Sequence, residues 1–369
     1  MPTLYDIAHF CSWNGYTEDM LPYLGVDKAS WTNKEFWSPY TVNLLYGSYK
    51  KSRIQRICES YSPSVERVRQ LLADGAKPDI KDKDGVTALI VCVKHNKPGH
   101  LDIIKLLLEA GADPNQTTRT RFPDGAYTPL RIAAFHNNVN AAKLLIAKGA
   151  VVNDIVMESA IEAGSKETLI YLLTLGCPLP RNAVKTAIIH YQIRIIQTLV
   201  NSGADVNADY PLHYAIYKGS INNYVRVLCM AGADVNLVGR GEIHEAPLHS
   251  TPLDIAILIA NDEAVQILCE YKVKINYISD YIVRETPLHR AIKLHKSHTY
   301  LYEHTYHHFG RGYGHYMQCV IILLKQSPDL TLLDEEGNTA LDCASSLQLS
   351  EIEILIHESV NEETEQHEI

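Results

Sequence analysis

The sequence predicts an all-α fold: a solenoid of about nine to ten stacked helix pairs joined by short β-hairpin fingers. Two repeated phrases lead to this prediction. Gly-Ala-Asp-x-Asn occurs directly after apolar helical runs, at 111–115, 203–207 and 232–236. Thr-Pro-Leu opens other segments, at 128–130, 251–253 and 286–288. Self-similarity of this kind is the signature of a repeat array, in which each unit packs on its neighbours.

Each residue of these phrases has a local role. Threonine is a good N-cap because its hydroxyl accepts from a free backbone N–H in the first turn of a helix. Proline fits the first helical position, where its missing N–H costs nothing. Glycine after the second helix supplies a left-handed residue. One unit is therefore a turn, a helix, a short loop, a second helix and a glycine stop.

The spacing of the phrases predicts where the helix pairs lie. The expected pairs cover residues 62–75, 87–111, 128–149, 154–176, 181–203, 211–232, 251–272, 287–327 and 339–358. The stop glycines Gly149, Gly176, Gly203 and Gly232 are only 27 to 29 residues apart. Because that spacing is short, we expect the fingers between these units to be truncated.

The combination of Thr-Pro-Leu-His with Gly-Ala-Asp-Val-Asn resembles the ankyrin repeat. The resemblance covers about residues 62–358 and implies a protein–protein interaction scaffold that binds through its fingers and concave face. It also implies that His213 and His289 brace the fingers through hydrogen bonds. Around the array we expect a divergent N-terminal capping repeat with an extended helix at 1–61, and an acidic disordered tail at 359–369. A histidine- and tyrosine-rich helical insertion is expected at 294–316.

Candidate partner-binding residues are aromatic, arginine and histidine side chains on the longer fingers. Tyrosine and arginine dominate the energetics of protein interfaces. The predicted contacts are Phe122, Tyr127, Arg240, His244, Tyr281 and Arg284.

Two alternatives remain open. The insertion carries six histidines, and His304 with His308 has the one-turn spacing that can bind zinc. A divergent N-terminal region could hide an enzymatic activity. Against this, the chain has no P-loop, GxSxG, HExxH or GxGxxG phrase. We therefore expect no enzyme, no catalytic residues, no metal site and no cofactor.

Composition narrows the partner class further. The formal net charge is −9, so a nucleic acid is a poor partner. The eight cysteines are widely spaced without a CxxC pair, which favours a reducing, cytoplasmic environment. No apolar run reaches membrane-spanning length and no signal peptide is recognised. A monomer that binds a protein is the expectation.

The last twelve residues contain five glutamates and neither lysine nor arginine. This segment resembles the acidic export signal of type IV-secreted ankyrin effectors in intracellular bacteria such as Legionella. The resemblance implies secretion into the host cytosol and a host eukaryotic protein as partner. A plain solubilising tail is the alternative.

Overall fold

The computed structural model describes residues 51–82, 84–118, 127–219, 222–239, 250–278, 284–304 and 314–367. These residues contain eighteen helices and no strand, which confirms the all-α prediction. The helices belong to two compact units: unit 1, Met1–Pro180, and unit 2, Arg181–Ile369.

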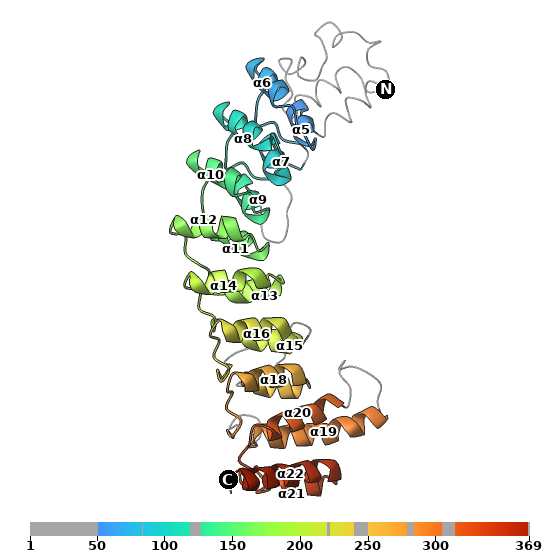
Figure 1. Ribbon diagram of the computed structural model, residues 1–369. Coiled ribbons are helices and arrows are strands. Elements are labelled where there is room, and N and C mark those ends of the chain that lie inside the picture. The colour runs from blue at the N-terminus through green and yellow to red at the C-terminus, as the bar shows by residue number, and fades with distance from the viewer. Residues whose placement is uncertain are drawn as a thin grey trace. The chain divides into compact units, whose positions relative to one another are not determined.

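Unit 1 is a stack of consecutive helix pairs (Figure 1). The pairs are α5 (Arg53–Cys58) with α6 (Val65–Ala73), α7 (Ala88–His95) with α8 (His100–Glu109), α9 (Pro129–Phe135) with α10 (Val139–Ala147), and α11 (Asp154–Glu162) with α12 (Lys166–Thr174). First helices pack on the first helices of adjacent pairs, and second helices pack on second helices. The core therefore lies between successive pairs.

Unit 2 repeats this arrangement (Figure 1). Its pairs are α13 (Ala183–Ile189) with α14 (Ile193–Asn201), α15 (Pro211–Lys218) with α16 (Asn222–Met230), α17 (Pro252–Leu258) with α18 (Asp262–Glu270), α19 (Pro287–His304) with α20 (Gly314–Leu324), and α21 (Ala340–Ser346) with α22 (Ser350–His367). The nine pairs of the described residues agree with the predicted nine to ten.

The helix ends follow the predicted local chemistry. The hydroxyls of Thr87 and Thr128 accept from the backbone N–H three residues on, and Pro129 occupies the first position of α9. Gly111 and Gly232 follow α8 and α16 with φ of 88° and 90°, a left-handed conformation that glycine adopts without strain.

A ladder of asparagine and aspartate side chains links most repeats to the next. In every rung, the side-chain oxygen of one repeat accepts a backbone N–H of the following repeat, at 2.7 to 3.0 Å. The rungs are Asp79 with Asp113, Asn115 with Val151, Asn207 with Asp234, Asn236 with Lys274, and Asn276 with Asp329. The ladder satisfies backbone groups at the turns between repeats and so fixes how neighbouring turns stack.

The ladder is interrupted at the truncated connection before α11. Asn153 accepts from Val156 N at 3.2 Å and caps α11 directly, instead of reaching into the next repeat. The turn before α15 is also short, because only Ala208 and Asp209 separate Asn207 from Tyr210. These short connections agree with the spacing of the stop glycines.

Two boundaries differ from the sequence predictions. The first described pair begins at Arg53, not at 62, because Ser52 forms a capping box with Gln55 and starts the short helix α5. Residues 62–64 are thus a connection inside a repeat. At the other end α22 continues through His367, so residues 359–367 are helical instead of irregular. Finger bases are closed by single backbone hydrogen bonds, such as Thr118 N to Tyr127 O at 3.1 Å, without assigned strands.

The insertion lengthens α19 and α20, which pack against each other. Figure 1 shows both helices reaching beyond the ends of α18 and α21. The base of α20 is tied to the preceding repeat, because the Tyr316 hydroxyl donates to Leu258 O at 3.0 Å. His315 Nδ1 also lies 2.7 Å from Asp262 Oδ1.

The ladder predicts a measurable loss of stability. Asn236→Ala leaves the backbone N–H of Lys274 without its acceptor and should lower the free energy of unfolding by about 1 kcal/mol. Urea unfolding followed by circular dichroism measures it. Asn201→Ala is the matched control, because the Asn201 side chain bonds only Gln197 of its own helix. Equal losses in both variants would contradict a stabilising ladder.

Candidate functional site

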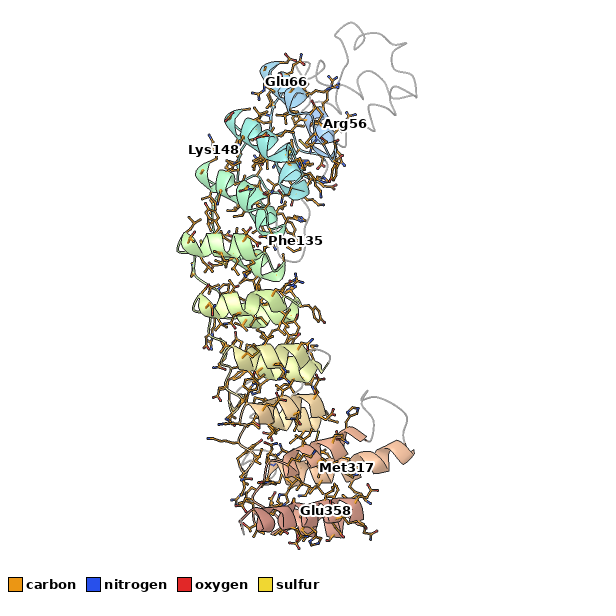
Figure 2. All side chains as sticks on the ribbon, in the orientation of Figure 1. Arg56, Glu66, Phe135, Lys148, Met317 and Glu358 are labelled. Atoms are coloured by element: carbon orange, nitrogen blue, oxygen red, sulfur yellow. The ribbon has the colours of Figure 1, made fainter. Side chains whose placement is uncertain are left out.

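The first helices expose a large side chain at their C-terminal ends. Seven residues after the N-cap, Phe135 of α9 is 44% exposed, Ile189 of α13 is 41% exposed and Leu258 of α17 is 37% exposed. Figure 2 marks Phe135 at the end of α9. In unit 2, Ile189, Tyr217 and Leu258 occupy this position on three successive first helices that pack side by side. Together they form a row on what we call the first-helix face.

In unit 1 a finger is held at its base by Tyr127. Its backbone N–H donates to Thr118 Oγ1 at 3.2 Å, while its carbonyl accepts from Thr118 N. The Arg131 guanidinium lies 4.4 Å from the centre of the Tyr127 ring, and Arg131 Nε donates to Ser159 Oγ at 3.0 Å. Stacking and a buried hydrogen bond thus fix the finger on α9 and α11.

In unit 2 a buried charge network connects three repeats. Arg290 of α19 is paired with Asp254 of α17, and its Nε donates to Glu285 Oε1 at 3.0 Å. Lys293 lies 3.3 Å from Glu285 and 2.9 Å from Asp334, at the base of the next finger. Although burial acts to raise the pKa of Asp334, hydrogen bonds from the Asn338 amide and Lys293 hold it below its usual value.

A tyrosine extends this network into the finger after Asn276. The Tyr277 hydroxyl lies 2.7 Å from Thr251 Oγ1, and burial, with the Asp254 carboxylate beside it, raises the pKa of Tyr277 far above its usual value. Thr251 and Asp254 meanwhile form the capping box of α17. The finger is therefore anchored through the same carboxylate that caps the helix and holds Arg290.

The two Thr-Pro-Leu-His histidines differ in their hydrogen bonding. His289 Nε2 lies 3.1 Å from Asn338 O, and its Nδ1 lies 2.7 Å from Thr286 Oγ1. Because a carbonyl can only accept, Nε2 carries the proton and Nδ1 accepts from the threonine hydroxyl. This geometry supports a bracing role.

At His213 one of these bonds is missing. Nε2 lies 3.2 Å from Ser250 O, but Nδ1 is buried without a partner because Tyr210 replaces the capping threonine. Burial lowers the pKa of His213 to about 4, so the ring is neutral near pH 7.

Two of the six predicted contacts fall within the described residues. Tyr127 lies at a finger base in unit 1 and is only partly exposed, and Arg284 is exposed at a finger base in unit 2. Phe122, Arg240, His244 and Tyr281 lie outside the described residues. Sequence reasoning missed the first-helix row. Its signal was the recurrence of Ile189, Tyr217 and Leu258 seven residues after the N-caps of α13, α15 and α17.

The described residues contain no group of three or more His, Cys, Asp or Glu that could hold a metal ion. The side chains of His298, His304, His307 and His308 are outside them. Burial raises the pKa of Cys229 and of Cys269 to about 11, which is unfavourable for a thiolate nucleophile. No helix among the described residues is both long and apolar enough to cross a bilayer.

The buried network predicts a large effect of removing its arginine. Arg290→Met leaves the carboxylates of Asp254 and Glu285 buried without their partner, and should cost about 3–5 kcal/mol of unfolding free energy. Arg226→Met, which breaks an exposed pair with Glu270, is the control and should leave stability nearly unchanged. Chemical denaturation compares the two, and similar losses would show that burial is unimportant.

His213 predicts a dependence of stability on pH. Its folded-state pKa of about 4 lies below the ordinary value of 6.5, so below pH 6.5 the unfolded chain binds a proton that the folded chain does not. Its contribution to stability should therefore fall as the pH drops from 6.5 to 4, by about 1.4 kcal/mol per unit. Thermal melts of His213→Gln should show a shallower decline than wild type, whereas the exposed control His357→Gln should follow wild type.

Comparisons with known proteins agree with this architecture. The family model for "Ankyrin repeats (3 copies)" matches residues 54–156 and 156–239, half of the chain. The Ankyrin repeat and KH domain-containing protein CBG24701 of Caenorhabditis briggsae is 28% identical over 181 residues, which cover 46% of this chain and 7% of that protein. Putative ankyrin repeat protein FPV031 of Fowlpox virus is 26% identical over 201 residues, 53% of this chain and 50% of that protein. This chain thus matches at most about half the length of these relatives.

Among solved structures, the human ASB11 ankyrin repeat domain has a TM-score of 0.45 at 21% identity, covering 56% of this chain and 91% of that domain. The ankyrin repeat domain of Bcl-3, a member of the IkappaB family, has a TM-score of 0.41 at 21% identity, covering 55% of this chain and 92% of that domain.

Ankyrin repeats generally mediate protein–protein interactions, and ankyrin-repeat proteins are typically scaffolds without enzymatic activity. With its stacked helix pairs, threonine caps, glycine stops and matching family model, this chain belongs to the ankyrin-repeat family.

Proposed function

We propose that this chain is a non-catalytic scaffold that binds another protein through its first-helix face and fingers. The observation that carries the proposal is the row of Ile189, Tyr217 and Leu258 on three adjacent first helices. Packing within the array leaves these side chains partly or substantially exposed. Aromatic and apolar side chains in a contiguous row are typical anchors of a protein interface.

The finger bases support the same proposal. Tyr127 and Arg131 hold one finger, and the network around Arg290 holds another. Binding costs less entropy when the base of a contacting loop is already held in place. The predicted contacts Phe122, Arg240, His244, Tyr281 and Arg284 remain part of the proposal as anchors on the fingers.

The narrower prediction of a type IV effector acting on a host eukaryotic protein rests on residues 359–369 alone. The relatives described above come from a nematode and a poxvirus, and α22 is helical through His367. That origin therefore stays a prediction, as do cytoplasmic location, a monomeric state, and the metal-binding or enzymatic alternatives.

Partner capture followed by matched variants tests the proposed scaffold. The immobilised full chain is used to isolate a protein from a eukaryotic lysate, and its affinity is then measured with purified components. The triple variant Ile189→Ala, Tyr217→Ala, Leu258→Ala should weaken that affinity by about tenfold or more. A finger variant, Phe122→Ala, Arg240→Ala, Tyr281→Ala, should also weaken it.

The control variant changes exposed apolar residues of second helices, Ile170→Ala and Met230→Ala, which are 43% and 68% exposed. It should bind like wild type. Circular dichroism and melting temperature establish that each variant is folded. Wild-type affinity in both the face and the finger variant would place the contact surface elsewhere and overturn the proposal.

A further inference from the structure

A basic and aromatic patch lies on α13 and α15, in the part of unit 2 where fingers are short. Its residues are Arg181, Lys185, Ile189, Tyr214 and Lys218, which we call the α13–α15 patch. Lys185 and Tyr214 lie three and four residues after the N-caps of α13 and α15. At the same positions of α17 and α19, Asp254 and Arg290 are instead buried beneath finger bases. Lys185 is partly exposed and Lys218 is exposed, so both are accessible to a ligand.

Two lysines of the patch converge on a single ring. The Lys185 ammonium lies 6.0 Å from the centre of the Tyr214 ring, and the Lys218 ammonium lies 5.6 Å from it. Neither lysine forms an ion pair with a carboxylate among the described residues. An anionic ligand at this patch would be attracted by both ammonium groups.

The other charges near the patch do not neutralise it. Asp209 is 3.9 Å from Arg181, which already balances it. His190 is exposed at the end of α13, and Asp254 of the adjacent α17 is buried against Arg290. The patch is therefore locally positive, although the whole chain carries a formal charge of −9.

The backbone beside the patch is strained. Asp209 and Tyr210 are consecutive non-glycine residues with φ of 59° and 58°, a left-handed conformation that costs such residues energy. The same turn leaves the buried Nδ1 of His213 without a hydrogen-bond partner, and the centres of the His213 and Tyr210 rings lie 5.4 Å apart. Strain and an unsatisfied buried acceptor are commonly concentrated at functional sites.

We propose that the α13–α15 patch binds an acidic segment of the protein partner that also carries a large apolar side chain. Carboxylates of the segment pair with Lys185 and Lys218, and the apolar side chain packs on the row of Ile189, Tyr217 and Leu258. This inference rests on the proposed scaffold function and names the chemistry of its partner. The small number of basic groups and the negative charge of the chain favour a peptide over a nucleic acid.

Fluorescence anisotropy with the full chain tests the proposal. The probe is a labelled short peptide of glutamates with a central leucine, and a lysine peptide with the same leucine is the reference. The acidic probe should bind, the lysine probe should not, and added salt should weaken binding. The variant Lys185→Gln, Lys218→Gln should lose affinity by about tenfold or more.

A control variant removes the same number of charges elsewhere. Lys143→Gln, Lys148→Gln is matched, because Lys143 lies 5.4 Å from the Tyr171 ring in a similar contact on second helices. It should bind the probe like wild type. The proposal is overturned if wild type does not bind the acidic probe, or if the two lysine variants bind it equally well.

A separate measurement distinguishes this failure from failure of the scaffold. If a captured partner binds Lys185→Gln, Lys218→Gln with wild-type affinity but loses affinity for the Ile189, Tyr217 and Leu258 variant, the acidic segment is wrong and the scaffold stands. If a single-stranded oligonucleotide binds the patch more tightly than the acidic peptide, the partner class is wrong.

Discussion

Each helix pair depends on its neighbours to bury its apolar surface. Leu130 and Ala133 of α9 are completely buried, and the neighbours of α9 along the array are the first helices α7 and α11. A single pair has too little interior to be stable alone, so stability comes from repeat-to-repeat interfaces. In the last described pair, α21 with α22, positions that are buried in earlier pairs are exposed and polar. Ser345 and His357 are exposed where the equivalent positions of α17 and α18 hold the buried Ile257 and Cys269.

Stacking by apolar contacts alone leaves polar backbone groups at every turn. The asparagine and aspartate ladder satisfies one such group at each of five interfaces and adds directionality that apolar packing lacks. The network of Asp254, Glu285, Arg290, Lys293 and Asp334 has a related role across two finger bases. Buried charges of this kind contribute little net stability, but they make incorrect finger positions costly because each would leave a charge unpaired.

The short repeats in the middle of the chain relax these constraints. Without long fingers, the first helices α13 and α15 keep basic side chains accessible, and Tyr210 stands where a capping threonine would satisfy His213. Tyr210 in place of threonine thus removes a hydrogen bond to His213, and it lies in a turn with a strained, left-handed backbone. We interpret this departure from the repeat pattern, which costs stability, as a sign that the surface it creates binds a partner.

The sequence by itself determined the repeat, the positions of most helix ends and the shortened fingers, because threonine caps, proline at the first position and left-handed glycines act through nearest neighbours along the chain. It misplaced the first pair, because the Ser62-Pro63-Ser64 break looks the same within a repeat as between repeats. It also placed candidate contacts on the fingers, mostly at residues outside the described structure, and these stay a prediction. Only the tertiary structure decided that Arg290 meets Asp254, that Lys185 and Lys218 converge on Tyr214, and that Ile189 and Leu258 share one face. These pairings join residues 29 to 69 positions apart, except that of Lys218 with Tyr214, which lie four positions apart on α15. They depend on how neighbouring repeats are stacked, which no local pattern specifies.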